Sequence, residues 1–441
     1  MKYTSVFAGF ARLDITGFLG QHIGGYYVER IAQGVDDPLY VNAVAFRQGK
    51  RTGVLLVCDM LGIYSDAAFR WPREVAARLG LSEDSVILCS THSHTTPVLQ
   101  GAREPSAPMY DAFFRRRMTD AAALAIQDLK PVTDVLSAQG EAPGFAFVRR
   151  YYYKDGHFQT WCTDPELTDR PGSEGDDSIR LVRILRQGGK EIALTNFQFH
   201  PDNIGSCRYS ADYPGAFRTH MERLRDVHCI YLDGAEGQLD GDGGLQVPLP
   251  GGHERMTGIG QRLAEAVLPL FDRAVSTGMT GLAMGQSFAH ARTKRDPDRL
   301  AEALRLIELH ESGRDGEIGP SWLSVPLVSE AYTLRRLEEA GQDWVDLPVS
   351  AMVFCGAAFV GIPGEPFCEI GKHIRAASPF PVTNVCCQAN GSQGYLPIAQ
   401  AYDQGGYEPR NTRFVKGVGE LLMDTADRLL AQFNTQMEKE V

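Results

Sequence analysis

Cys89-Ser90-Thr91-His92-Ser93-His94-Thr95-Thr96-Pro97 follows a short apolar run, residues 85–88, that is typical of a buried strand. Pro97 ends any regular continuation, because its ring fixes φ and removes the backbone donor. If the chain stays extended through His92 and His94, both imidazoles face the same side, since strand side chains alternate. Imidazole is a common zinc ligand and a proton carrier near neutral pH. The stretch alone fits either a metal or catalytic site or a solvated polar loop.

Composition limits the classes of protein to which the chain can belong. It has 441 residues, of which 43% are hydrophobic and 22% charged, as in ordinary globular proteins. The net charge of -11 argues against nucleic-acid binding, because no broad basic surface is available. No run of 18 apolar residues and no signal-peptide pattern occurs, so we expect neither a membrane span nor secretion. The nine cysteines are scattered without a CxxC pair, which favours free thiols in the cytoplasm over disulfides or a cysteine zinc site.

The periodicity of apolar residues predicts a mixed α/β fold in which mixed β-sheets are flanked by helices. Strands are expected over residues 39–46, 52–60, 85–88, 179–186, 191–199, 229–232, 349–354, 357–362 and 381–388, and helices over 67–79, 109–129, 216–224, 252–274, 298–309, 328–340, 367–375 and 414–433. Residues 285–345 carry many charges at helical spacing, which predicts a peripheral helical insert. Without a repeat or a low-complexity linker, residues 1–441 are expected to form a single domain.

Three further polar residues repeat the position of His92 at the end of an apolar run. His200 follows residues 191–199, Glu365 follows residues 357–362, and Tyr395 follows residues 381–388. In α/β sheets the carboxyl ends of strands meet at one crevice, where ligands bind. Two imidazoles, a carboxylate and a phenolic oxygen make a suitable zinc shell for hydrolysis, with room for water. We therefore predict a metal site at the carboxyl ends of the strands.

Other polar motifs allow a functional and a structural interpretation. Arg149 and Arg150 stand among aromatic residues, where they either clamp an anionic or carbonyl group or snorkel from an edge strand. The acidic, glycine-rich residues 233–244 suggest calcium, but their spacing misses the EF-hand pattern. Asp59 at a strand end is expected to be a structural hydrogen-bond acceptor.

The residues from Thr91 to Pro97 resemble the Thr-His-Thr-His-Ser-Gly-Pro turn of the neutral (non-lysosomal) ceramidases and their shorter bacterial relatives. Four more motifs recur in the same order: Phe199-His200-Pro201, Ser210-Ala211-Asp212-Tyr213-Pro214-Gly215, Pro363-Gly364-Glu365 and Gly394-Tyr395. The resemblance covers nearly the whole chain and the catalytic domain of that family. It implies a zinc-dependent amidase with one Zn²⁺ ion.

The resemblance also implies roles for individual residues. The metal ligands would be His92, His200, Glu365 and Tyr395. His94 would face the substrate, and Arg149 and Tyr407 would hold or polarise the scissile carbonyl, where they stabilise an oxyanion.

The chain departs from the ceramidase pattern in two respects. The family's Gly-Asp-Val-Ser-Pro-Asn loop aligns with Gly237-Gln238-Leu239-Asp240-Gly241-Asp242, so that Asp240 stands in place of the serine near the zinc. A carboxylate there could act as a general base or repel an acyl carbonyl. The C-terminal immunoglobulin-like domain of the ceramidases has no counterpart. We therefore expect a small-molecule amide that is smaller or more polar than ceramide.

Two rival functions remain open from the sequence. Asp240 motivates a non-catalytic relative that keeps a metal- or ligand-binding pocket. A phosphodiesterase with two metals would need more ligands, of which His94 and Asp59 are the obvious extras. Assembly into a homo-oligomer also stays open.

Overall fold

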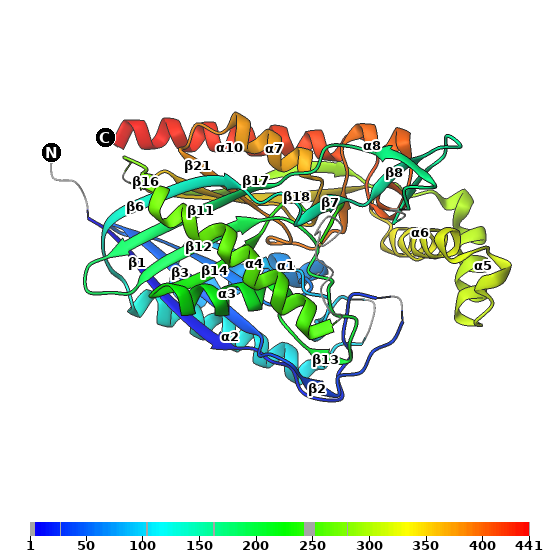
Figure 1. The fold of residues 1–441 in the computed structure, drawn as a ribbon, viewed down its shortest axis with the longest axis horizontal. Helices are drawn as coiled ribbons and strands as arrows, with labels where there is room; N and C mark the ends of the chain where they lie inside the picture. The colour runs from blue at the N-terminus through cyan, green and yellow to red at the C-terminus, as the bar shows by residue number, and fades with distance from the viewer. Residues whose placement is uncertain are drawn as a thin grey trace.

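The computed structural model describes residues 5–26, 28–102, 105–161, 164–241, 252–279 and 281–440. Its centre consists of two β-sheets that pack face to face, and helices cover the outer face of each sheet (Figure 1). The predicted mixed α/β class, with mixed sheets flanked by helices, is confirmed.

The larger sheet has nine strands, and its backbone order along the sheet is β14-β12-β11-β6-β1-β3-β4-β5, with β16 paired to β6. Their bounds are β1 Val6–Asp14, β3 Tyr40–Gln48, β4 Arg51–Cys58, β5 Val86–Ser90, β6 Lys130–Glu141, β11 Ser178–Arg186, β12 Glu191–Phe197, β14 Val227–Asp233 and β16 Val275–Ser276. Most pairs are antiparallel, but β4 with β5 and β12 with β14 are parallel. The outer face of this sheet is covered by α1 Ser65–Arg78, α2 Pro108–Gln127, α3 Asp212–Leu224 and α4 Gly252–Arg273.

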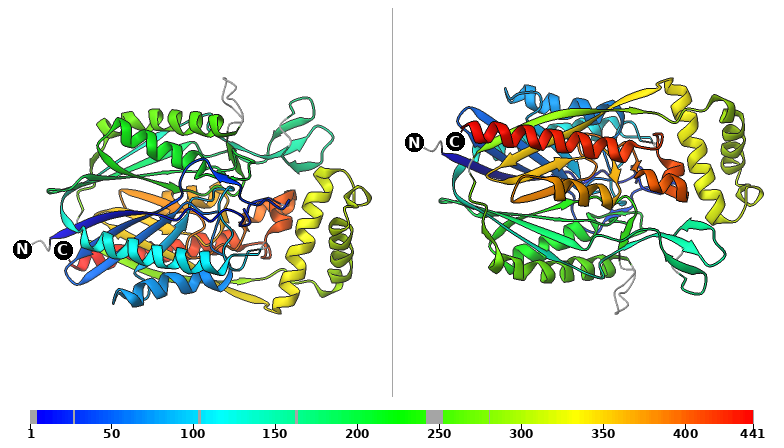
Figure 2. Two further views of the ribbon diagram at one scale, coloured as in Figure 1. Left: turned by 90° about the horizontal axis from the view of Figure 1, so that it is seen from below. Right: turned by 90° about the horizontal axis from the view of Figure 1, so that it is seen from above.

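The smaller sheet has the order β17-β18-β19-β21, formed by Leu282–Arg292, Trp344–Phe354, Ala357–Gly361 and Val382–Cys386. Its outer face is covered by α7 Cys368–Ala377 and α10 Val418–Glu440 (Figures 1 and 2). Short strands pair near the ends of the two sheets: β2 Gly34–Val35 with β13 Arg208–Tyr209, β7 Ala146–Val148 with β15 Leu239–Gly241, β20 Glu365–Pro366 with β22 Tyr395–Leu396, and β8 Arg150–Tyr153 with β9 Phe158–Thr160 and β10 Thr168–Pro171.

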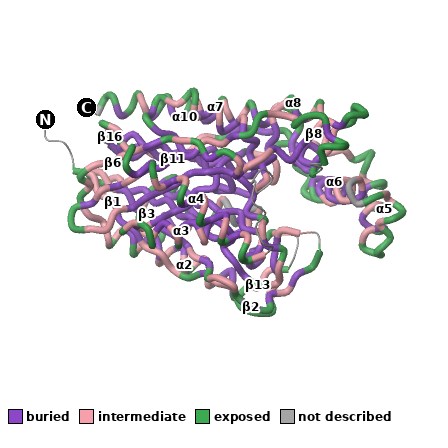
Figure 3. The backbone as a smooth tube through the Cα atoms, viewed as in Figure 1, coloured by how far each residue is buried: buried purple, intermediate pink, exposed green. Residues whose placement is uncertain are grey.

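Burial on both faces explains why the central strands are continuously apolar. In β3, Ala43 and Ala45 pack toward α1 and α2, while Val44 and Phe46 pack toward the smaller sheet. Successive side chains of a strand point to opposite faces, so a strand between two buried layers needs apolar residues at both sets of positions. Figure 3 shows this centre as almost entirely buried.

The segment over residues 285–345, which was expected to be a helical insert, is helical in its middle but forms β-strands at both ends. Its first residues belong to β17, which pairs along its whole length with β18 in the smaller sheet. Alternating half-buried residues of β17 carry polar groups, which hid the strand in the sequence. The helices between these strands are α5 Leu300–Glu311 and α6 Ser321–Ala340, with single 3-10 turns at Pro297–Arg299 and Asp315–Glu317. They lie at the end of the molecule opposite both termini (Figure 1).

Asp59 is a structural residue, as predicted. Its carboxylate, at 0% exposure, accepts hydrogen bonds from both terminal nitrogens of Arg218, at 2.6 and 2.5 Å. It also accepts a bond from the Tyr40 backbone N–H. Across the described ranges, no helix is both long enough and apolar enough to cross a lipid bilayer.

Candidate active site and metal centre

His92 lies just beyond β5, in backbone that is not extended. Its φ is +60°, in the left-handed region, so the expectation of an extended run through His92 and His94 is wrong. The carbonyl of Leu61 lies 2.7 Å from Nδ1 of His92, which places the ring proton on Nδ1 and leaves the Nε2 lone pair free. Strained backbone of this kind costs of order 1–3 kcal/mol and is concentrated at functional sites.

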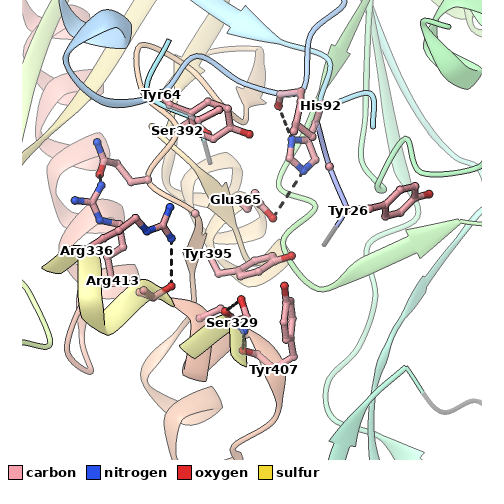
Figure 4. A pocket seen from close by; sticks show the side chains of 18 of the residues that line it. Tyr26, Tyr64, His92, Ser329, Arg336, Glu365, Ser392, Tyr395, Tyr407 and Arg413 are labelled. Atoms are coloured by element: carbon pink, nitrogen blue, oxygen red, sulfur yellow. Dashed lines mark hydrogen bonds and ion pairs between the residues drawn. The ribbon is translucent and has the colours of Figure 1, made fainter. Parts of the chain in front are cut away.

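His200 follows β12 and is held in the same way. Its Nδ1 lies 2.9 Å from the Leu239 carbonyl, and its Nε2 lies 3.4 Å from Oε2 of Glu365. Nε2 of His92 lies 3.8 Å from the same carboxylate oxygen. Figure 4 shows His92 and Glu365 facing each other across the cavity. The predicted convergence of His92, His200 and Glu365 therefore exists.

Glu365 and Tyr395 are brought together by the short parallel strands β20 and β22, in which they are register partners. Gln388 donates a hydrogen bond to Oε1 of Glu365 at 3.3 Å, which leaves Oε2 directed at the histidines. Gly237 packs against this turn so closely that a Cβ atom on it would lie 2.4 Å from the Glu365 carbonyl oxygen. Only glycine can occupy that position without moving the carboxylate.

The histidines and Glu365 fit a zinc ion. Nε2 of His200 and Oε2 of Glu365 are buried and have no hydrogen-bond partner, although buried polar atoms are nearly always partnered. Burial opposes the charged forms, yet His92 and His200 lower the pKa of Glu365 to about 2. Burial and Arg149 act to lower the pKa of His200. The carboxylates of Glu236 and Glu365 have the larger, opposite effect, so the pKa of His200 rises to about 9. The centre therefore attracts a cation, and imidazoles with a carboxylate are the donors that Zn²⁺ takes.

His94 belongs to this centre as well as to the cavity wall. Its Nε2 lies 3.4 Å from Nε2 of His92, and the three histidines together could hold a metal. Burial, with the neighbouring His92 and His200, keeps the pKa of His94 well below its usual value, so the ring is neutral. Gly25, at φ +110°, packs against the ring, where a Cβ would lie 2.8 Å away.

Arg149 is not a snorkelling side chain, because it is only 3% exposed. Its Nε donates to Glu408 at 2.8 Å, and its terminal nitrogens donate to Asp240 at 2.9 Å and to the Tyr395 hydroxyl and the Gly237 carbonyl at 3.1 Å each. The guanidinium therefore fixes the position of the Tyr395 hydroxyl.

Asp240 and Tyr407 lie on opposite sides of this network. Asp240 is in β15, 4.0 Å from Nδ1 of His200, on the ring edge that faces away from Glu365. The ring of Tyr407, at the start of α9 Tyr407–Asn411, lies 5.5 Å from the ring of Tyr395. The short helix α8 Ala399–Gln404 precedes it.

One carboxylate near the centre had no sequence prediction. Glu236 is fully buried, with Oε1 4.0 Å from Nε2 of His92. Together with Asp233 and Cys387 it forms a second buried group whose atoms could hold a metal. Burial and Asp233 raise the pKa of Glu236 well above its usual value. Glu236 lies in a glycine-rich acidic loop, and such a composition is typical of a solvated turn. The one sequence signal for its burial is the apolar strand β14 that directly precedes the loop.

The centre opens into a cavity of about 550 Å³ that reaches from the histidines to α6. Its polar lining includes His92, His94, Glu365, Tyr395, Arg336 and Arg413 (Figure 4). The helix α6 therefore shapes the site, because it supplies one of the cavity walls.

Comparison with solved structures shows where this architecture occurs. A structure of a ceramidase complexed with C2 superposes with a TM-score of 0.74 at 15% identity, covering 98% of this chain and 76% of the other. The neutral ceramidase from Pseudomonas aeruginosa superposes with a TM-score of 0.72 at 16% identity, covering 97% and 75%. This chain has the ceramidase fold. The resemblance predicted from the motifs is thus confirmed at the level of the fold, whereas no family model and no curated protein sequence matches the chain.

Proposed function

We propose that the protein is an amide hydrolase that uses one Zn²⁺ ion. The observation that carries the proposal is the convergence of the Nε2 atoms of His92 and His200 on one buried carboxylate oxygen of Glu365, at 3.8 and 3.4 Å. We assign these three residues and Tyr395 as the ligands. The ceramidase fold supports the reaction class, because the structures that share it are named as ceramidases.

The protein side chains have separate tasks in this reaction. Zinc, when bound, acts as a Lewis acid and lowers the pKa of water. The neutral His94 ring, at the cavity wall beside His92, can accept a proton and pass it to the leaving amine. Arg149 holds the Tyr395 hydroxyl toward the proposed ligands. Tyr407, whose ring lies beside that of Tyr395, together with Arg149 would bind the carbonyl oxygen of the substrate.

The substrate that we propose is smaller or more polar than ceramide. Asp240 replaces the family's serine and adds a carboxylate beside Arg149. The far end of the cavity is lined by polar side chains, including Ser329, Thr333 and Asn411. A polar substrate can form hydrogen bonds with this wall, whereas a long alkyl chain cannot.

The rival functions receive less support. A phosphodiesterase with two metals would need Asp59 as an additional ligand, but both carboxylate oxygens of Asp59 accept hydrogen bonds from Arg218. A binding-only relative would not need a neutral imidazole beside the predicted ligands. We also propose a reducing cytoplasmic location, which agrees with the eight described cysteines being free.

Metal analysis and an amide panel test the proposal together. The purified protein, reconstituted with zinc, should contain about one ion per chain and release amines from short acyl amides. The double variant His92→Ala, His200→Ala should lose the zinc and the activity, whereas the control His290→Ala changes an exposed histidine and should lose neither. Zinc-free protein after reconstitution, or zinc-loaded protein that hydrolyses no amide, would contradict the proposal.

A further inference from the structure

The end of the cavity away from His92 is lined by two arginines from separate parts of the chain. Arg336 is on α6, and Arg413 follows α9. Both lie on the side of Glu365 and Tyr395 opposite Tyr26 in Figure 4. The scissile amide and this end therefore share one space.

Arg413 has an unusual environment for a largely enclosed cation. Its guanidinium donates to the side-chain oxygen of Gln393, and no carboxylate in the described ranges forms an ion pair with it. Burial lowers its pKa, and no neighbouring carboxylate opposes that effect. A desolvated charge without a counter-charge is costly, and proteins pair such charges or use them to bind ligands.

The nearby charges do not neutralise this end of the cavity. Glu339 also lines it, but this carboxylate is 67% exposed and lies 3.7 Å from Arg335. Arg336, on the exposed side of α6, donates a hydrogen bond to Thr333 at the same end. Arg413 is thus a cation of this end that no carboxylate of the described ranges pairs with.

We propose that the substrate is an amide with a carboxylate at its other end, and that Arg413 binds this carboxylate. This inference rests on the proposed amidase function and names its substrate class. A planar carboxylate matches the fork of a guanidinium, which can donate two parallel hydrogen bonds. Gln393, which holds Arg413, lines the same cavity as Glu365 and Tyr395. A spacer of methylenes between the amide and the carboxylate would therefore span from the proposed ligands to Arg413.

Matched substrates test the proposal on the zinc-loaded full chain. One series is the ω-(acetylamino)alkanoates with two to six methylenes, and the other replaces the carboxylate by a hydroxyl. The wild type should prefer the carboxylate series by about 10–100-fold in kcat/KM, the worth of a charge-assisted hydrogen bond. Arg413→Gln should lose this preference, mainly through KM, and Arg413→Lys should regain part of it. The control Lys416→Gln removes an exposed cation paired with Asp403 and should keep the preference.

The outcomes separate this inference from the proposed function. Equal turnover of both series by the wild type, unchanged in Arg413→Gln, overturns the carboxylate site and leaves the amidase standing. If neither series is hydrolysed, a thermal shift with the alkanoates settles the point. A shift that Arg413→Gln abolishes supports the carboxylate site while the amidase proposal fails, and the absence of any shift overturns both.

Discussion

Arg149 and Arg413 are two enclosed arginines of one site, and their surroundings are opposite. Arg149 directs its donors at Glu408, Asp240, Tyr395 and a backbone carbonyl. Burial acts to lower the pKa of Arg149, but the opposite effect of Asp240, Tyr395 and Glu408 is larger. The pKa of Arg149 is therefore well above its usual value. Arg413 has Gln393 as a side-chain partner, and burial lowers its pKa.

This difference distinguishes two kinds of enclosed charge. We call a group closed when each of its charges is paired with protein atoms, and open when a charged or polar group faces the cavity and can bind a ligand. The pair of Asp59 and Arg218 is closed in the same sense as the Arg149 network, since each charge is met by protein atoms. His92 and Glu365 resemble Arg413, because they line the cavity and can accept a ligand from it. Substitutions in closed groups should therefore change stability, with an added effect on turnover where the group also touches the site, as Asp240 does. Substitutions in open groups should change binding and turnover.

The largest effect is expected for Glu365→Gln, in the open group. The amide keeps the shape but removes the negative charge that attracts a cation, so zinc content should fall. Amide hydrolysis should drop by more than about 10²-fold, beyond the 10–100-fold typical of an outer partner of a metal site. The control Glu339→Gln removes a carboxylate from the same cavity and should retain its zinc. Full zinc occupancy in Glu365→Gln would remove Glu365 from the ligand set.

Glu408→Gln breaks the closed group and should act on stability. Glu408 is fully buried and meets Arg149 at 2.8 Å and Arg150 at 3.3 Å. Removing its charge leaves the two arginines undercompensated, at a cost of about 3–5 kcal/mol in the free energy of unfolding measured with urea. The exposed pair of Asp424 and Arg428 gives the control, because Asp424→Asn should cost less than about 1 kcal/mol. Equal costs for the two variants would show that the Arg149 network is not structural.

The sequence indicated the residues that converge around Glu365 better than it indicated Glu408 in the closed group or Arg413 in the open one. His92, His200 and Glu365 each follow an apolar strand, and the parallel pairs β4 with β5 and β19 with β21 carry strand ends to the same crevice. Nothing comparable marks Glu408 or Arg413, whose partners come from distant segments. Pairing between remote side chains depends on the packing of whole elements, which local periodicity does not contain.

Local periodicity also failed to predict the strands β6 and β17 and the burial of the loop that contains Glu236. β6 mixes exposed and half-buried residues, and β17 alternates around Gln286 and His290, so neither shows the apolar run that identified β4. Glu236 lies in a loop whose composition indicates solvent exposure, yet it is fully buried beside His92. Burial overrode composition at Glu236, whereas β6 and β17 are strands because of their pairing with β11 and β18, which their mixed composition does not reveal.

Asp240→Asn should have a moderate effect and decides between two roles for this residue. The carboxylate pairs with Arg149 and lies on the edge of His200 away from Glu365, which suits a positioning role. We expect kcat to fall about 10-fold, as for an outer partner, with zinc content unchanged. The general base that its alignment with the family serine suggested would instead cost roughly 10²–10⁴-fold and alter the pH profile.

The smallest effect is expected for the stability of Arg413→Gln. The substitution removes a desolvated charge that has no carboxylate partner in the described part of the chain, and in exchange it gives up the hydrogen bond to Gln393. The free energy of unfolding should therefore change by less than about 0.5 kcal/mol, or rise, in the absence of ligand. Urea titration beside Glu408→Gln gives the comparison directly, since both variants replace a charge by an amide in the same site. A loss of about 2 kcal/mol or more would mean that the folded protein itself supplies a counter-charge to Arg413. The guanidinium would then belong with Arg149 among the closed groups, and it would not be available to bind a substrate carboxylate.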